Sequence, residues 1–284
     1  DADSIQIGPG RAFGAAFAFA SIAKSLGLPD ALGASRSGRL ALMMAVLRPI
    51  KPVSKLGTVA MARNQAVEEL LGISAFDEDD LYGALDWLEK NQDSIEDALF
   101  RPRGGQCQTL FLYDVTSSYL EGQQNELAKY GYNRDKKAGK KQIVIGLLKD
   151  ENGLPVSVQV YEGNTLDHKT VSDQIKKLKE RFGVKRVVMI GDRGMLKQAQ
   201  IAELGAHEWN YITALTKPQV ESLLEQGVIQ LDLFDEKICQ VEQEGRRLIL
   251  RRNPKRAEEV GANRQSRLEK FLALATETNE KLSH

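Results

Sequence analysis

The chain has 284 residues, of which 42% are apolar and 27% are charged, with 39 Lys and Arg balanced by 39 Asp and Glu. This composition excludes a disordered or fibrous chain and fits one large or two ordinary globular domains. Zero formal net charge gives no global preference for nucleic acid or membrane, so any such partner must meet a local patch.

Charge is nevertheless segregated along the sequence. Residues 1–66 carry eight Lys and Arg against three acids, and residues 67–100 carry eleven acids against Lys90. Residues 129–142 carry six Lys and Arg against Asp135. The last segment is therefore the clearest local patch for a polyanionic partner.

Cysteine spacing and apolar runs bear on the cellular compartment. Cys107 and Cys239 lie far apart, without a CxxC pair or a nearby His cluster, which gives no support for a disulfide framework or a zinc site. The apolar run 12–20 is far shorter than the ~20 residues that span a bilayer, and it lacks the basic leader of a signal peptide. We therefore expect a cytoplasmic protein with no membrane partner.

The first third of the chain carries helical patterns. Segment 101–106, Arg-Pro-Arg-Gly-Gly-Gln, is a composition break typical of a domain boundary. We place a helical N-terminal domain, a candidate DNA-binding domain, at residues 1–104. Its predicted helices are 12–26, 37–47 ended by Pro49, 54–71 ended by Gly72, and 79–100.

Beyond this boundary the pattern changes to strands and helices in the order βββαβαβ. We expect an α/β fold, α+β overall, in which residues 105–216 form an RNase H-like mixed-sheet core. Residues 217–284 are expected to form a β-rich insertion subdomain. The core strands are predicted at 109–114, 142–148, 156–161, 186–190 and 209–213, with helices at 169–182 and 195–204. The insertion is predicted to have strands at 228–234, 237–241 and 246–250 and a helix at 254–281.

Two carboxylates follow apolar strands of this core. Asp114 is expected to end the first strand and Asp192 the fourth. Carboxylates at adjacent strand ends converge on one divalent cation, and Mg²⁺ takes one or two carboxylates while leaving its other positions to water and phosphate. The alternative is that each Asp begins a turn or caps a helix, because Asp forms local hydrogen bonds in both settings.

Five segments give these residues a specific context. They are Tyr-Asp-Val-Thr-Ser-Ser-Tyr at 113–119, Tyr-Gly-Tyr-Asn-Arg-Asp at 130–135, Gln-Ile-Val-Ile-Gly-Leu at 142–147, Gly-Asn-Thr-Leu-Asp at 163–167 and Gly-Asp-Arg-Gly-Met at 191–195. Together they resemble bacterial insertion-sequence transposases of the DDE class, whose catalytic domain is RNase H-like. Segments 231–235 and 251–254 also resemble the insertion that such enzymes carry before their last acid.

The resemblance implies a function and a set of site residues. Asp114 and Asp192 would be the first two acids of the triad and would bind Mg²⁺, with Mn²⁺ as a substitute. The enzyme would cut DNA at element ends and transfer the freed 3′-hydroxyl to target DNA. Its partners would be double-stranded DNA and a second copy of the chain, as a homodimer in a synaptic complex, in the nucleoid of the bacterial cytoplasm.

The third acid of such enzymes is a Glu within a Tyr-Arg-Glu-Lys type signature. This signature is absent from the sequence, and we expect the third acid to lie beyond the end of the chain. Residues 1–284 alone are then expected to bind DNA without cutting it. We accordingly assign no catalytic role to Glu258, Glu259, Glu269 or Glu280.

The basic segment 129–141 lies between the first two predicted strands, beside the expected metal site. Its Lys and Arg side chains are suited to neutralise phosphates, and Tyr130 and Tyr132 to stack on an exposed base. A solvated hairpin loop is the alternative interpretation. The candidate DNA-binding residues are Lys129, Arg134, Lys136, Lys137, Lys140 and Lys141.

Asp167 and His168 follow Gly163 and Asn164 and invite a role as acid or metal ligand. A capping role for Asp167 is favoured, because it directly precedes the predicted helix at 169–182 and its carboxylate is suited to accept free amide hydrogens.

Two other functions stay open. A haloacid dehalogenase-type phosphatase is a remote alternative, since its motif needs a second Asp where Thr116 stands, and its core is parallel. A non-catalytic DNA-binding remnant, or regulator of transposition, is the alternative from a different class. The sequence downstream of His284 would separate it from a transposase fragment.

Overall fold

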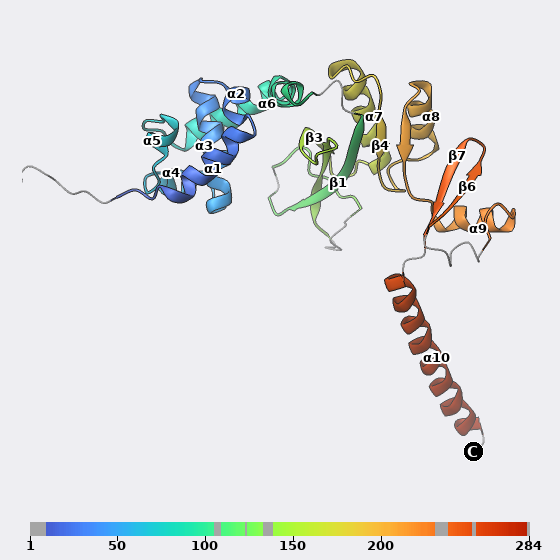
Figure 1. Cartoon of the computed structure of the whole chain (residues 1–284). Coiled ribbons are helices and arrows are strands. Elements are labelled where there is room, and N and C mark those ends of the chain that lie inside the picture. Colours follow the sequence, from blue (N-terminus) through green and yellow to red (C-terminus); the bar gives the residue numbers. More distant parts are fainter. Residues whose placement is uncertain are drawn as a thin grey trace, which may run out of the picture. The chain divides into compact units, whose positions relative to one another are not determined.

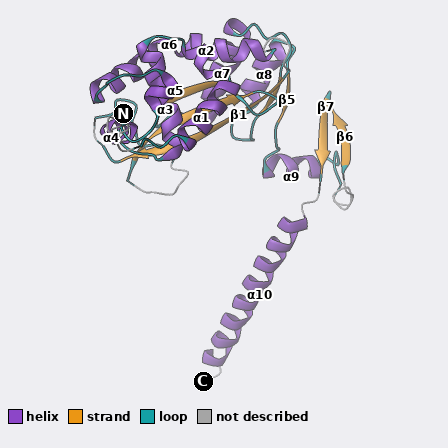
Figure 2. Cartoon of the chain, turned by 60° about the vertical axis from the view of Figure 1, so that its left-hand side comes forward, coloured by secondary structure: helices purple, strands orange, loops and turns teal. Residues whose placement is uncertain are grey.

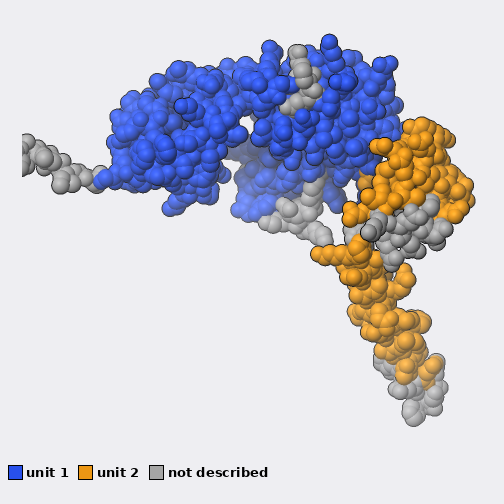
Figure 3. All heavy atoms as spheres, viewed as in Figure 1, with its two compact units in different colours: residues 1–213 blue, residues 214–284 orange. Residues whose placement is uncertain are grey.

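The computed structural model describes residues 10–104, 109–122, 124–132, 139–230, 238–251 and 254–282. The chain divides into two compact units, residues 1–213 and residues 214–284, which Figure 3 shows in blue and orange. Each unit is described by itself.

The first unit begins with helices, drawn from blue to blue-green in Figure 1. Pro49 lies inside α3, so the prediction that it ends this helix is wrong. Lys51 is extended instead (φ −154°, ψ 114°), because Pro52 follows it and excludes the helical conformation from the preceding residue. The helices are α1 (Gly14–Ser25), α2 (Leu28–Leu32), α3 (Arg36–Ile50), α4 (Lys55–Ala62), α5 (Val67–Leu71) and α6 (Glu78–Phe100).

The single helix predicted at 54–71 is in fact two helices, α4 and α5. Between them the backbone bonds to Ala12 rather than to its own helix: the Ala12 N–H donates to the Asn64 carbonyl at 2.9 Å, and the Ala66 N–H donates to the Ala12 carbonyl at 3.0 Å. A tertiary contact therefore overrides the local helical pattern. Apolar side chains of α3 form the centre of this helical region, with Leu40, Met43 and Leu47 nearly inaccessible to solvent.

The rest of the first unit contains a five-stranded mixed sheet in the order β3-β2-β1-β4-β5. Figure 2 shows its strands in orange. β1 pairs antiparallel with β2 and parallel with β4, so the sheet differs from the parallel core of a haloacid dehalogenase-type phosphatase. The order βββαβαβ predicted for an RNase H-like core is confirmed. The strands are β1 (Leu110–Leu120), β2 (Lys141–Lys149), β3 (Pro155–Glu162), β4 (Val188–Ile190) and β5 (Asn210–Ile212).

One face of this sheet is buried under α7 (Asp167–Lys176). Phe111, Tyr113 and Met189 point to the same face and belong to one apolar cluster with Val171 and Ile175 of the helix. The helix continues as a π-helical turn, Lys177–Arg181, and the connection between β4 and β5 contains α8 (Gln198–Ala206). Burial on a single face explains why buried residues alternate with more exposed ones from Leu110 to Thr116 of β1.

Helix α6 packs against β3, which is an edge strand of the sheet. The Val158 N–H donates to Glu96 Oε1 at 2.9 Å, and the Gln92 amide donates to the Val158 carbonyl at 2.6 Å. Side chains of the helix thus satisfy both backbone groups of Val158. An edge strand that is covered in this way is closed to pairing with another chain.

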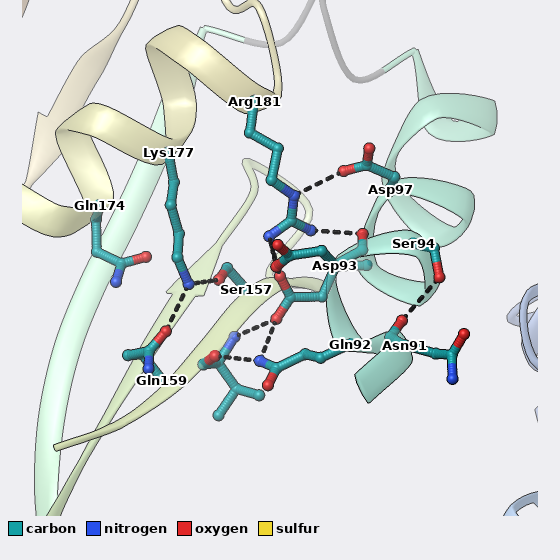
Figure 4. A network of polar contacts seen from close by, with 12 residues as sticks. Asn91, Gln92, Asp93, Ser94, Asp97, Ser157, Gln159, Gln174, Lys177 and Arg181 are labelled. Atoms are coloured by element: carbon teal, nitrogen blue, oxygen red, sulfur yellow. Dashed lines mark hydrogen bonds and ion pairs between the residues drawn. The ribbon is translucent and has the colours of Figure 1, made fainter. Parts of the chain in front are cut away.

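Arg181 is the centre of a polar network at this contact (Figure 4). Its guanidinium lies 2.6 Å from Asp93, 2.8 Å from Glu96 Oε2 and 3.0 Å from Asp97 Oδ1, all on α6. Beside it, the Lys177 ammonium contacts Ser157 and Gln159 of β3 at 3.0 and 2.8 Å. Burial lowers the pKa of Lys177. The network joins α6, the π-helical turn and the edge strand.

The second unit contains α9 (Lys217–Glu225), the hairpin β6 (Cys239–Gln243) and β7 (Arg246–Leu250), and α10 (Pro254–Leu282). The sequence pattern did not predict α9. Glu244 and Gly245 both have positive φ, 49° and 73°, as in the two-residue turns that favour hairpins. Of the strand predicted at 228–234, residues 228–230 are not extended in a sheet, and the rest lies outside the described residues.

None of the helices in the described part of the chain combines the length and the apolar character needed to cross a membrane.

Replacement of Arg181 by Met tests the network. Glu96 is 8% exposed, and loss of its partner leaves a carboxylate without compensation at the edge of the core, so we expect unfolding to become easier by about 3 kcal/mol. Arg101→Met is the matched control, because Arg101 pairs with Asp97 at 2.9 Å while its side chain is 68% exposed. It should cost less than about 0.5 kcal/mol. Urea denaturation measures the free energy of unfolding of both variants. Equal losses of stability would contradict the central role given to Arg181 in the network.

Candidate functional site

Asp114, within β1, and Asp192, after the end of β4, have equivalent positions relative to the pairing of these two parallel strands. The last residues of the β1–β4 pairing are Leu112 and Ile190, and each Asp lies two residues beyond its own partner in this pair. Adjacent strands are about 4.8 Å apart, so this register brings Leu112 and Ile190, two residues before each Asp, side by side. Their assignment as site residues remains a prediction.

The prediction that Asp114 ends β1 is wrong. β1 continues to Leu120 and stays paired with β2 over this whole length, whereas its pairing with β4 stops at Leu112. Asp114 therefore lies where one neighbour of β1 leaves the sheet. Its side chain is exposed, on the face opposite to buried Tyr113 and Val115. Its Oδ1 accepts the Val115 N–H at 2.8 Å.

Asp192 forms the turn that the alternative interpretation describes. Its Oδ1 accepts the backbone N–H groups of Gly194 at 2.8 Å and Met195 at 2.9 Å. Within the described part of the chain, Oδ2 has no hydrogen-bond or ion-pair partner. The turn fixes the orientation of the carboxylate and leaves one oxygen open, so the turn and metal interpretations are compatible at this residue.

The described residues include no group of three or more His, Cys, Asp or Glu side chains arranged to hold a metal ion. What they offer is the pair of exposed carboxylates, Asp114 and Asp192. Oxygen ligands of this kind suit Mg²⁺, which binds one or two carboxylates and retains several waters. The donor set therefore fits a hard divalent cation and does not fit a zinc site built from Cys and His.

The basic segment is described in part. Lys129, Lys140 and Lys141 are described, whereas Arg134, Lys136 and Lys137 lie outside the described residues. The Lys140 ammonium lies 3.5 Å from Glu121, with both side chains well exposed. Lys141 Nζ lies 6.0 Å from the centre of the Tyr130 ring. Exposed contacts of this kind are weak, so these cations are available to another anion.

Gln142 joins three segments beside this basic region, and the sequence did not single it out as a site residue. It is 2% exposed, and its side-chain amide donates to the Tyr132 and Gly163 carbonyls, both at 2.9 Å. Its backbone exchanges two hydrogen bonds with Lys129, at 2.9 and 3.1 Å. We name this contact the Gln142 clasp.

Two glycines make the Gln142 clasp possible. A Cβ on Gly131 would lie 2.0 Å from the Gly163 carbonyl oxygen, and a Cβ on Gly163 would lie 1.9 Å from the Gln142 carbonyl oxygen. Neither position has room for a side chain. The backbone at Gly131 thus contacts the backbone at Gly163, although the two residues are far apart in the sequence. These glycines were the signal that could have indicated the contact.

A small cavity of about 160 Å³ adjoins the Gln142 clasp. The segment 163–167, His168 and the turn that follows Asp192 all contribute to its wall. Burial, followed by Lys197 and Lys169, lowers the pKa of His168, and Asp167 opposes this effect. The imidazole is therefore mostly neutral at pH 7. The wall of the cavity includes Tyr132, Asn164, Asp167, His168, Gly194 and Lys197.

The predicted capping role of Asp167 is corrected by the structure. Leu166 is the N-cap of α7 and makes no side-chain hydrogen bond to the helix, while Asp167 is the first residue of the helix. A carboxylate in the first turn is still favourable, because it faces the positive end of the helix dipole.

Comparison with known proteins places these residues in a family context. The family model described as "Transposase DDE domain" matches residues 105–282, a range that includes both carboxylates, the basic segment and the Gln142 clasp. A comparison with curated proteins found no match.

Solved structures give more distant similarities. The piggyBac transposase synaptic complex with hairpin DNA is 11% identical, with a TM-score of 0.44, over 77% of this chain and 49% of that one. The Mos1 transposase paired-end complex with left transposon end is 10% identical, with a TM-score of 0.27, over 66% of this chain and 70% of that one. This chain thus spans about half the length of the piggyBac protein.

Replacement of Gly131 by Ala tests the Gln142 clasp. The new Cβ meets the backbone oxygen of Gly163, which moves only with the turn that follows β3, so we expect the free energy of unfolding to fall by about 3 kcal/mol. Gly122→Ala is the control, since a Cβ there has no neighbour within 4 Å, and it should cause no loss. Both variants are compared by urea denaturation. Equal stability of the two would show that the close approach does not exist.

Proposed function

The chain belongs to the transposase DDE domain family, and on this basis we propose that it acts in DNA transposition, in which the whole enzyme cuts DNA at element ends and transfers the 3′-hydroxyl to target DNA, whereas residues 1–284 alone bind DNA without cutting it. The observation that carries the proposal is the register of β1 and β4. Asp114 and Asp192 each lie two residues beyond the last pair of these strands, Leu112 and Ile190, inside the matched range, which supports a shared cation site.

Asp114 and Asp192 are the residues that would hold the divalent cation. When bound, Mg²⁺ supplies a Lewis acid for phosphoryl transfer. The chain itself supplies orientation. The amides of Gly194 and Met195 hold one oxygen of Asp192, and the β1–β2 pairing on both sides of Asp114 fixes that strand. Ligands held in this way need little rearrangement when a cation arrives.

The basic segment is the proposed DNA contact. It follows β1 and precedes β2, and its backbone is tied to Gln142 at Lys129. Tyr130 and Tyr132 are 65% and 80% exposed, so both rings are open to an unpaired base. Lys and Arg side chains here would neutralise backbone phosphates, which is the term that dominates the affinity of proteins for DNA.

We extend the proposal to the assembly. An element has two ends, and each strand cleavage needs its own pair of carboxylates. A homodimer that holds both ends in one synaptic complex supplies one site for each end.

Mn²⁺ binding tests the carboxylate pair without the need to know the element's end. Water-proton relaxation should report Mn²⁺ bound to the wild-type chain and a loss of more than about tenfold in affinity for Asp114→Asn or Asp192→Asn. Asp173→Asn is the matched control, because Asp173 is an exposed carboxylate on α7, and it should bind Mn²⁺ as the wild type does. Equal binding by all four proteins would refute the metal assignment.

The salt dependence of DNA binding tests the basic segment. The double change Lys129→Ala and Lys140→Ala should weaken binding to any duplex and reduce the slope of log affinity against log salt by about 1.8, roughly 0.9 for each phosphate that is no longer neutralised. The control is Lys176→Ala with Lys185→Ala, two exposed lysines elsewhere in the same unit. Fluorescence anisotropy with a labelled duplex gives both slopes. If the first variant keeps the wild-type slope, the segment is ordinary solvated surface.

A further inference from the structure

One turn connects the cavity beside the Gln142 clasp to the proposed cation site. Gly194 lines the cavity, and its N–H donates to Asp192 Oδ1 at 2.8 Å. The edge of the cavity is therefore two positions along the chain from the carboxylate that would face the scissile phosphate, and in hydrogen-bond contact with it. Successive base pairs of B-DNA are about 3.4 Å apart along the axis, so a strand with one phosphate at Asp192 brings a neighbouring nucleotide within reach.

The size of the cavity limits what it can hold. Its volume of about 160 Å³ is below the roughly 300–1,000 Å³ of pockets that enclose whole cofactors or drug-sized ligands. The Gln142 clasp holds together the segments that carry Tyr132, Gln142 and Asn164, which approach too closely at Gly131 and Gly163 to admit a Cβ, and Gly194 and Lys197 complete the wall from a further segment. A small site with a fixed wall suits one part of a polymeric ligand.

The chemistry of the wall is mixed in charge. Lys197 is exposed and makes no ion pair with any residue that the structure describes, so its ammonium is available to an anion. Asn164 and Asp167 add an amide and a carboxylate, which suit the polar edge of a base better than a bare anion. The exposed ring of Tyr132 offers a stacking surface.

We propose that this cavity binds one nucleotide of the DNA strand beside the scissile phosphate, with Lys197 on its phosphate and Tyr132 against its base. The proposal rests on the proposed function: it places Tyr132 of the basic segment and Lys197, which lies outside that segment, around one nucleotide. Gln142 lines the cavity and has a positioning role in this scheme, because its side-chain amide holds the segments that carry Tyr132 and Asn164.

Binding of a labelled duplex by the full chain, without divalent ions, tests the role of Lys197. Lys197→Ala should reduce the slope of log affinity against log salt by about 0.9, which corresponds to about eightfold weaker binding at 0.1 M salt if the contact has no effect at 1 M. Lys185→Ala is the matched control, because Lys185 lies before the start of β4 and Asp192 lies after its end, so Lys185 is at the opposite end of this strand from the proposed site. The Lys185→Ala variant should keep the wild-type slope.

Tyr132 gives a second test of the same site. Tyr132→Ala should weaken binding about fivefold or more, the loss expected for one stacked base, and Tyr132→Phe should restore it because the ring alone provides the stacking. Failure of the Phe variant to restore binding would overturn the role given to the ring.

The imidazole signals of His168 show whether the contact lies inside the cavity. DNA should shift the His168 signals in an NMR spectrum, and the shift should vanish in Lys197→Ala. His207 is an internal reference, because it caps the C-terminal end of α8 whereas Lys197 precedes its N-terminal end, about 13 Å away along the nine-residue helix.

The outcomes separate this proposal from the proposed function. A wild-type chain that binds no duplex would refute both. Normal binding with equal slopes for Lys197→Ala and Lys185→Ala would refute the cavity alone. A reduced slope with unchanged His168 signals would place the phosphate outside the cavity and would also overturn it.

Discussion

The unequal pairing of β1 on its two sides is the constraint on which the candidate site depends. β2 follows β1 through Leu120, but β4 pairs with only three residues of it, ending at Leu112. Beyond that point one side of β1 loses its neighbour while the strand itself stays fixed by β2. Asp114 is the second residue of this stretch, so its carboxylate has both a rigid backbone and open space. A strand that ended at Asp114 would offer the space without the rigidity.

Ion pairs connect the helical region to the part of the first unit that contains the sheet. The acidic segment 67–100 looks like a surface that would repel DNA, yet the fold uses several of its carboxylates internally. Asp93, Glu96 and Asp97 meet Arg181, while Asp80 meets Arg36 at 2.8 Å, and this contact lowers the pKa of Asp80. Charge that is segregated along the sequence is thus paired in the structure. The Lys and Arg residues of the basic segment are the ones that sequence reasoning left for an external anion.

Sequence patterns predicted the parts of the fold that depend on local alternation. The apolar strands β2 and β3 and the long helix α6 follow directly from periodicity. The second half of β1 did not, because Thr116, Ser117 and Ser118 are typical of turns and form a strand here only because β2 pairs with them. The break between α4 and α5 likewise depends on a hydrogen bond to Ala12, which no local pattern records.

The candidate site shows the same division. Residue type and position after an apolar run were enough to identify Asp114 and Asp192 as candidates, because carboxylates are informative in themselves. Gln142 was missed, because glutamine is informative only when its partners are known, and the Tyr132 and Gly163 carbonyls lie 10 and 21 positions away.

Asp192 shows that the two interpretations of a strand-end carboxylate are not exclusive. A carboxylate has two oxygens, and the Gly194 and Met195 amides occupy only Oδ1. The turn therefore occupies Oδ1 with two hydrogen bonds and fixes the orientation of the carboxylate, while Oδ2 is left for another ligand. The same turn carries Gly194 and Lys197 to the wall of the cavity. A short segment therefore both orients a carboxylate and contributes to the wall of a polar cavity, which is the arrangement that the proposed nucleotide site requires.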